Sequence, residues 1–252
     1  MTKKVYLKTF GCQMNKADSL RLSEIFKAEG YTFTDNLKEA DVIICNTCSV
    51  RHHAENKAMS YVGRLKDIKE EKSAVRICVV GCMAQRLRED IVKRLPHVDY
   101  VVGPSSMFEL PKLIKEDKRG VYADSPDKRK EFPGVQYNTI NTDSPFSGYV
   151  PIMKGCNNFC AYCIVPYVRG REEYRDRKDI LKECETLAGR GIKEIMLLGQ
   201  TVNSHPDFKE ILKDTAGISG IDRVLFVTSY PGHMDKETVD IVAETPELCN
   251  YF

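Results

Sequence analysis

The sequence predicts an α/β protein in two parts, an open parallel sheet flanked by helices followed by part of a β/α barrel. Short apolar runs alternate with amphipathic stretches along the 252 residues, which is typical of parallel strands covered by helices. Residues 124–148 interrupt this pattern and are rich in Pro, Asp, Asn, Ser and Lys, as expected of a connector. We therefore expect a first domain at 1–123, a linker at 124–148 and a second domain at 149–252.

In the first domain, hydrophobic patterning predicts four strands and four helices. The strands are expected at 5–10, 41–46, 76–80 and 98–102, and the helices at 18–29, 52–70, 84–94 and 107–115. In the second domain we expect strands at 149–153, 194–198 and 223–228, and helices at 179–190 and 236–244. At roughly 30 or more residues for each β-α unit, the second domain has room for three such units. In a β/α barrel the chemistry takes place at the carboxyl ends of the strands.

Composition narrows the class of protein. The sequence has no apolar run long enough to cross a membrane, and its start, Met1-Thr2-Lys3-Lys4, lacks the apolar core of a signal peptide. A net charge of +2 does not indicate a dedicated nucleic-acid binder, although a local basic patch is compatible with it. Ten cysteines without a secretory signal favour a reducing, cytoplasmic location, where clustered thiols hold metal more often than they form disulfides.

Three cysteines lie within one short loop, Cys156-x3-Cys160-x2-Cys163. A 4Fe–4S cluster takes Cys thiolates as ligands, and three ligands leave one of its irons open to a substrate or cofactor. A structural zinc site would need a fourth protein ligand, and neither Cys184 nor His205 stands at a usual finger spacing. The spacing therefore favours a cluster over a zinc knuckle or three unrelated core cysteines.

A second group of cysteines is dispersed in sequence. Cys12, Cys48 and Cys82 each follow a predicted strand by one or two residues, and the carboxyl ends of parallel strands share one edge of a sheet. Gly11 and Gly81 permit a close backbone approach there. Position alone leaves two interpretations open, a second cluster or three independent turn residues. Cys45 and Cys78 instead lie inside apolar strands and are predicted to be core residues. Cys184 and Cys249 are also expected to be structural.

The sequence around both groups resembles the radical S-adenosylmethionine (SAM) methylthiotransferase family. The resemblance covers about residues 5–252 and is carried by TFGCQMN at 9–15, NTCSVR at 46–51, VGCMAQ at 80–85 and the three-cysteine loop with an aromatic before its last cysteine. It implies two 4Fe–4S clusters. One, on Cys156, Cys160 and Cys163, would bind SAM at its open iron, and the other, an auxiliary cluster, would be held by Cys12, Cys48 and Cys82.

Within this family the sequence is closest to the MiaB-type branch. The similarity lies in NTCSVR followed by AENK at 54–57, and in YCIVPYVRGRE at 162–172. Members of that branch add a methylthio group to carbon 2 of an N6-prenylated adenosine next to the tRNA anticodon. Two alternatives remain open from the sequence. One is a sister branch that acts on threonylcarbamoyl-adenosine in tRNA or on an aspartate of a ribosomal protein, and the other is a non-catalytic iron–sulfur scaffold.

The resemblance also implies partners and site residues. Two SAM molecules would be used in each turnover, one cleaved to a radical and one donating a methyl group, with no side chain acting as nucleophile. We expect a tRNA substrate, an external flavodoxin- or ferredoxin-like electron donor, a monomer and no membrane partner. The SAM contacts would be Tyr162, Gly199, Gln200, Asn203 and Ser229. Arg169 and Arg171 are candidate contacts to a carboxylate or an RNA phosphate, and ordinary turn chemistry is the alternative for these residues.

The sequence departs from the family pattern at three places. It ends at Phe252, where relatives continue with further barrel strands and a small β domain, so we expect a truncated barrel. The stretch after Ser204-His205 is shorter than usual. Tyr174 also stands where relatives often have serine.

Overall fold

The computed structural model describes residues 2–124 and 144–250. The chain divides into two compact units. Unit 1 comprises Met1–Pro133 together with Asn158–Gly170, and unit 2 comprises Gly134–Asn157 together with Arg171–Phe252. Most of the linker expected at 124–148 lies outside the described residues. The segment 158–170, expected in the second domain, is grouped with unit 1, where its helix α6 (Val165–Arg169) packs against α3 (Cys82–Leu87).

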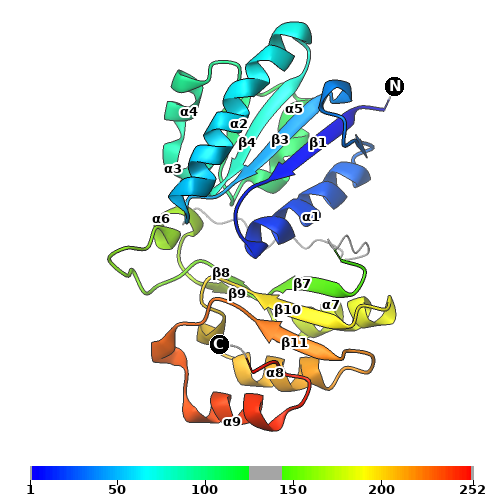
Figure 1. The fold of residues 1–252 in the computed structure, drawn as a ribbon, viewed down its shortest axis with the longest axis vertical. Helices are drawn as coiled ribbons and strands as arrows, with labels where there is room; N and C mark the ends of the chain where they lie inside the picture. Colours follow the sequence, from blue (N-terminus) through cyan, green and yellow to red (C-terminus); the bar gives the residue numbers. More distant parts are fainter. Residues whose placement is uncertain (1, 125–143, 251–252) are drawn as a thin grey trace. The chain divides into compact units, whose positions relative to one another are not determined.

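Unit 1 is built on a six-stranded sheet in the order β2-β1-β3-β4-β5-β6, in which every pairing is parallel. Figure 1 labels its strands β1, β3 and β4. Its strands are β1 (Lys4–Thr9), β2 (Thr32–Phe33), β3 (Val42–Thr47), β4 (Arg76–Gly81), β5 (Tyr100–Val102) and β6 (Gly120–Tyr122). The central strand β3 is buried over its whole length, as expected for a parallel strand covered on both faces.

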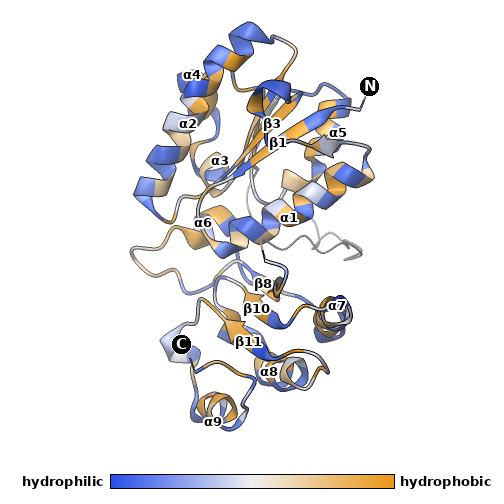
Figure 2. Ribbon diagram, turned by 45° about the vertical axis from the view of Figure 1, so that its right-hand side comes forward, coloured by the Kyte–Doolittle hydropathy of each residue, from blue (hydrophilic) through white to orange (hydrophobic). Residues whose placement is uncertain are grey.

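Helices cover both faces of this sheet. They are α1 (Gln13–Ala28), α2 (His52–Glu71), α3, α4 (Glu89–Arg94) and α5 (Leu110–Lys115). Alternate residues of β3 point to opposite faces. Ile43 and Cys45 pack in a core with α2, α3 and α4, whereas Val42 and Ile44 pack in a core with α1 and α5. In Figure 2 β3 is coloured mainly as hydrophobic, while much of α2 is hydrophilic.

The four strands and four helices predicted for the first domain are present, with three differences. Helix α1 begins at Gln13, five residues before the expected start at Asp18. The expected helix at 84–94 is divided into α3 and α4 at Arg88, whose φ of 48° interrupts the helical backbone. The edge strands β2 and β6 were not predicted, because two- and three-residue strands carry too little periodicity to be recognised.

Unit 2 contains a three-stranded parallel sheet in the order β11-β10-β7 and a two-stranded antiparallel ribbon, β8-β9. The strands are β7 (Ser147–Pro151), β8 (Met153–Lys154), β9 (Glu173–Tyr174), β10 (Glu194–Leu198) and β11 (Arg223–Phe226). Each strand of the parallel sheet is followed by a helix, α7 (Arg177–Gly189), α8 (Phe208–Ala216) or α9 (Lys236–Glu244). The α/β class and the three expected β-α units are thus confirmed.

Helix α8 was not predicted. Its apolar residues Phe208, Ile211 and Leu212 follow helical spacing and are buried against the sheet. The helix occupies only nine residues, so its periodic signal is short. In the described ranges 2–124 and 144–250, no helix combines the length and apolar character needed to cross a bilayer.

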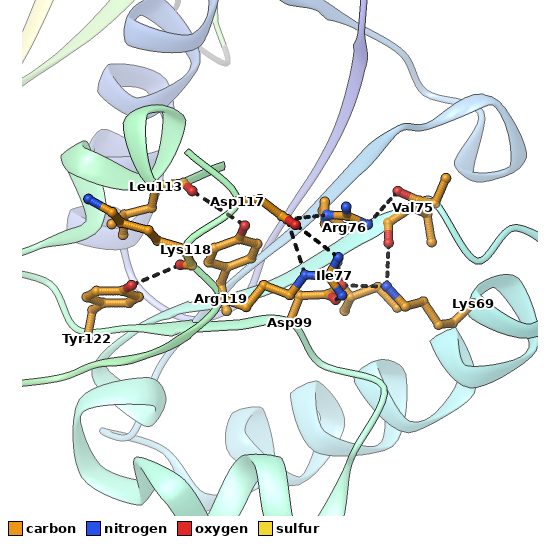
Figure 3. Close-up of polar contacts among 12 residues, drawn as sticks. Lys69, Val75, Arg76, Ile77, Asp99, Leu113, Asp117, Lys118, Arg119 and Tyr122 are labelled. Carbon is orange, nitrogen blue, oxygen red and sulfur yellow. Dashed lines mark hydrogen bonds and ion pairs between the residues drawn. The ribbon is translucent and has the colours of Figure 1, made fainter. Parts of the chain in front are cut away.

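A buried carboxylate, Asp99, joins elements at the amino end of the unit 1 sheet (Figure 3). Its Oδ2 accepts hydrogen bonds from the Ile77 backbone N–H at 2.8 Å and from Lys69 Nζ at 2.7 Å. Its Oδ1 accepts one from Arg119 Nη1 at 3.2 Å. The Asp99 side chain is only 5% exposed, so its negative charge depends on these donors for stabilisation.

Replacing Asp99 with alanine is expected to lower the free energy of unfolding by about 3 kcal/mol, because Lys69 and the Ile77 N–H lose a buried partner. Asp117→Asn is the matched control, because Asp117 has a φ of 46°, a conformation that asparagine tolerates better than alanine. Asp117 also pairs with Arg119, but its side chain is 56% exposed, so the expected loss is below about 1 kcal/mol. Urea denaturation measures the free energy of unfolding of both variants. Equal losses would contradict the stabilising role assigned to the buried Asp99 carboxylate.

Candidate metal centre

The three dispersed cysteines lie at the carboxyl ends of three neighbouring strands. Cys12 follows β1 and is the N-cap of α1, Cys48 directly follows β3, and Cys82 directly follows β4 as the first residue of α3. The strands are adjacent in the order β1-β3-β4. The Cys12 thiol donates to Asn15 Oδ1 at 3.7 Å, and Arg169 donates to the same oxygen at 3.0 Å and to Cys82 Sγ at 3.2 Å. Cys12 and Cys82 are also close enough to Cys48 to raise the pKa of its thiol. The structure therefore brings the three cysteines together at one edge of the sheet, and we call Cys12, Cys48 and Cys82 in this place the cysteine edge.

Two glycines make this approach possible. Gly11 has a φ of +112°, and a Cβ there would lie 2.3 Å from the Cβ of Cys48. Gly81 has a φ of +94°, and a Cβ there would lie 2.5 Å from the carbonyl oxygen of Thr47. Both positions combine a backbone conformation that favours glycine with a lack of space for a side chain. The role expected of these glycines from the sequence is confirmed.

We expect Gly11→Ala to displace Cys48 from the cysteine edge, because the added methyl group would overlap with the Cys48 side chain. After anaerobic reconstitution, the variant should lose about four irons per chain, one 4Fe–4S cluster. Gly30→Ala is the matched control, because Gly30 also has a positive φ of 84° but nothing lies within 4 Å of its added Cβ. Equal iron content in the two variants would contradict the steric argument.

The electrostatics of the edge favour a thiolate at Cys12 only. The hydrogen bond from Cys48 lowers the pKa of Cys12 to about 6, with Arg169 contributing its positive charge against the opposing effect of burial. The same hydrogen bond, together with burial, raises the pKa of Cys48. Burial also raises the pKa of Cys82, while Arg169 acts to lower it. Thiolates are the form in which cysteine binds metal.

Arg169, the last residue of α6, reaches this edge within unit 1. Its Nε donates to Cys82 Sγ at 3.2 Å, and its Nη2 donates to Asn15 Oδ1 at 3.0 Å. Nη2 also lies 2.8 Å from Asp18 Oδ2 in an ion pair whose two side chains are each 8% exposed. Burial acts to lower the pKa of Arg169, but Asp18 and the cysteine sulfurs raise it above its ordinary value.

Asn15 and Asp18 were not among the predicted site residues. Asn15 is fully buried, and its Nδ2 donates to the carbonyl oxygens of Phe10 and Thr47, both at 2.9 Å. It therefore ties the turn after β1 to the end of β3. Both residues lie in the first two turns of α1. Several buried residues of this helix are polar, so the apolar spacing by which a helix is recognised is weak there. The signal that could have identified them is the polar pattern directly after Cys12.

The loop with the three closely spaced cysteines spans the boundary of the two units, between Asn157 and Asn158. In unit 2, Cys156 is 7% exposed, and its Sγ lies 3.1 Å from Thr201 Oγ1. The preceding Gly155 has a φ of +77° and donates its N–H to Gln200 Oε1 at 2.6 Å. Thr201 and Gln200 follow β10, so the loop after β10 fixes the start of the cysteine loop.

The rest of that loop belongs to unit 1. Cys160 and Cys163 are half-buried, and the Cys163 N–H donates to the carbonyl oxygen of Cys160 at 2.9 Å in a tight turn. Tyr162 projects from this turn and is 92% exposed. Phe159 packs its ring edge-on against Tyr167. The turn therefore presents two cysteines beside an exposed aromatic ring.

The structure assigns packing contacts to several predicted SAM residues. A Cβ at Gly199 would lie 2.7 Å from the Met153 side chain, so glycine is required there for packing. Asn203 exchanges two hydrogen bonds with the backbone of Tyr230, at 2.8 and 2.9 Å, which joins the loops after β10 and β11. Ser229 is half-buried beside Thr228, whose φ is 73°. Arg171 is exposed, in contrast to Arg169.

The remaining cysteines agree with their predicted packing roles. Cys45, Cys78 and Cys184 are fully buried in hydrophobic cores, and Cys249 is half-buried. Throughout 2–124 and 144–250, no three His, Cys, Asp or Glu side chains are grouped to ligate a single metal ion. A cluster spreads its thiolate ligands over several irons, and the soft sulfur donors of the cysteine edge fit such a group.

Comparisons with known proteins agree with the two-part organisation. Residues 4–103 match the family described as "Uncharacterized protein family UPF0004", and residues 150–252 match the radical SAM superfamily. The superfamily match implies a 4Fe–4S cluster and SAM. The structure is similar to that of the radical S-adenosylmethionine methyltransferase TsrM from Kitasatospora setae, with a TM-score of 0.66, 13% identity, and coverage of 98% of this chain and 58% of TsrM. At that identity the likeness concerns the fold alone.

Curated relatives named tRNA-2-methylthio-N(6)-dimethylallyladenosine synthase match nearly the full chain. The protein from Dictyoglomus thermophilum is 39% identical over 99% of this chain and 58% of its own length. The protein from Syntrophobacter fumaroxidans is 42% identical over 98% of this chain and 56% of its own length. The chain thus spans less than two thirds of the relatives' length. It has a region similar to the UPF0004 family followed by a region similar to the radical SAM superfamily, and it resembles the synthases named above.

Proposed function

We propose that this protein is a radical SAM methylthiotransferase that adds a methylthio group to carbon 2 of N6-prenylated adenosine next to the tRNA anticodon. The observation that carries the proposal is the convergence of Cys12, Cys48 and Cys82 at the ends of three adjacent strands, in a chain that also has the Cys156-x3-Cys160-x2-Cys163 loop. Two thiol triads supply ligands for two clusters. The similarity to synthases of this name supports the choice of substrate.

Each triad would hold one 4Fe–4S cluster. Cys156, Cys160 and Cys163 would hold the SAM-binding cluster, and Cys12, Cys48 and Cys82 the auxiliary cluster. When bound, these groups and two SAM molecules supply the radical and methyl-transfer chemistry that an unactivated C–H bond requires, which acid–base catalysis by side chains cannot. The residues of the chain then bind, orient and shield the reactants.

Specific residues would perform these tasks. Gln200 and Thr201 orient the start of the cysteine loop through Gly155 and Cys156. Tyr162, Gly199, Gln200, Asn203 and Ser229 are our proposed SAM contacts. Of these, the exposed ring of Tyr162 has an open face for stacking. Arg171, which is exposed, is the better candidate for an RNA phosphate, because the Arg169 guanidinium is engaged inside unit 1.

We further propose that the protein acts in the cytoplasm as a monomer with an external flavodoxin- or ferredoxin-like electron donor. The side chains at the two triads are cluster ligands in this scheme and provide no reductant of their own. An external one-electron donor is therefore required for SAM cleavage.

The test is an anaerobic assay with reconstituted protein, SAM, a reductant and three substrates. They are tRNA carrying N6-dimethylallyladenosine, tRNA carrying threonylcarbamoyl-adenosine, and a ribosomal-protein peptide containing aspartate. Mass spectrometry of the nucleosides and of the peptide detects the added methylthio group. We expect modification of the prenylated tRNA only. Modification of either other substrate would assign the protein to a sister branch, and cluster-containing protein that cleaves no SAM would indicate an iron–sulfur scaffold.

A further inference from the structure

The guanidinium of Arg169 lies against the cysteine edge although it is 87 residues from Cys82 in sequence. It comes from the segment Asn158–Gly170, which the structure groups with unit 1. Its Nε–H donates directly to the Cys82 sulfur at 3.2 Å. The sequence predicts for Arg169 only a contact with a carboxylate or an RNA phosphate, and the structure adds the contact with sulfur.

Two further partners fix the position of the guanidinium. Nη2 donates to Asn15 Oδ1 at 3.0 Å and forms an ion pair with Asp18 Oδ2 at 2.8 Å. Both partners come from α1, which starts immediately after Cys12. The Arg169 and Asp18 side chains are each 8% exposed, and a buried charge is tolerated only when it is paired and hydrogen-bonded. Arg169 is therefore held facing the sulfurs and is shielded from solvent.

The packing of the helix that carries Arg169 also supports the contact with Cys82. Arg169 ends helix α6, whose Val168 is 1% exposed, and α6 packs against α3, which begins with Cys82. Gly170 follows with a φ of +79° and ends the helix directly after the arginine. The guanidinium is thus supported by packing on its own side and by Asn15 and Asp18 on the other.

We infer that Arg169 is a positioning residue of the auxiliary cluster, donating a hydrogen bond to the Cys82 ligand sulfur and raising the reduction potential of that cluster. The inference rests on the proposed function. Hydrogen bonds to ligand sulfurs, local charge and burial are the levers by which a protein sets such potentials. A buried cation that donates to a ligand sulfur stabilises the more negative, reduced form of the cluster.

The experiment isolates the auxiliary cluster in a parent variant, Cys156→Ala/Cys160→Ala/Cys163→Ala, and measures its midpoint potential by redox titration followed by electron paramagnetic resonance. Three changes are introduced into this parent: Arg169→Gln, Arg169→Gln/Asp18→Asn and Arg171→Gln. The double change removes the carboxylate that Arg169→Gln would leave buried and unpaired. Arg171→Gln is the matched control, since it removes an arginine two positions away that is exposed.

We expect both variants that lack Arg169 to keep about four irons per chain and to show a midpoint potential shifted to more negative values. Arg171→Gln should keep the potential of the parent. An unchanged potential in the double variant with its iron retained would overturn the role of Arg169 and leave the proposed function intact. Loss of iron from both Arg169 variants would also overturn the tuning role, since Arg169 would then be required for cluster assembly instead. A parent without iron would overturn both proposals.

Discussion

Replacing Cys12, Cys48 and Cys82 together by alanine is expected to lower methylthio transfer to prenylated tRNA by at least about 100-fold, because the ligands of the auxiliary cluster are lost. SAM cleavage should persist, since the Cys156, Cys160 and Cys163 ligands remain. The measurement is the yield of methylthio-nucleoside beside the yield of 5′-deoxyadenosine in one reaction. These three residues follow β1, β3 and β4, which are adjacent in the sheet.

The matched control is Cys45→Ala/Cys78→Ala. Both thiols are buried in the cores on opposite faces of the same sheet, and they lie inside strands β3 and β4 and not in the turns that follow these strands. This control should transfer the methylthio group at close to the wild-type rate. A triple variant that is as active as the control would contradict a role of the cysteine edge in the reaction.

Replacing Cys156, Cys160 and Cys163 together by alanine is expected to reduce the formation of 5′-deoxyadenosine from SAM by at least about 100-fold, and methylthio transfer should be lost with it. The expectation follows from the spacing of the loop, which provides three ligands and leaves one iron open for SAM. Chromatography of the SAM cleavage products after addition of reductant provides the measurement.

Cys184→Ala/Cys249→Ala is the control for this second variant, because neither thiol belongs to the cysteine loop. Cys184 is fully buried on α7, and burial raises its pKa to about 12. The control should cleave SAM normally. Residual 5′-deoxyadenosine at the wild-type level in the Cys156, Cys160 and Cys163 variant would show that SAM is cleaved elsewhere in the protein.

Much of the fold was predictable because its elements carry strong periodic signals. Strands β3 and β4 are almost continuous apolar runs, and α2 is 20 residues long, so neither type of element is ambiguous. The position of the three dispersed cysteines followed from the topology of a parallel sheet alone. The division of the predicted helix into α3 and α4 at Arg88 could not be predicted, because a positive φ at an arginine does not change the hydrophobic pattern.

The environment of the candidate site was less predictable. Arg169 pairs with Asp18, which is 151 positions away in sequence. A single sequence, without an alignment in which the two positions co-vary, gives no information about such a long-range contact. The buried polar face at the start of α1 was also unpredictable. Asn15 and Asp18 are polar and would be expected at the surface of a helix, but both are buried in the folded protein. The six cysteines could be proposed as ligands from the sequence because the chemistry of cysteine limits its roles, whereas arginine and asparagine have many roles.

The most direct test of two clusters in one chain is iron and sulfide content, with electron paramagnetic resonance, after anaerobic reconstitution. The wild-type protein is compared with the Cys156→Ala/Cys160→Ala/Cys163→Ala and Cys12→Ala/Cys48→Ala/Cys82→Ala variants. Two independent clusters predict about eight irons in the wild type and about four in each variant. About four irons in the wild type, with none left in the first variant, would remove the auxiliary cluster and contradict the assignment as a methylthiotransferase.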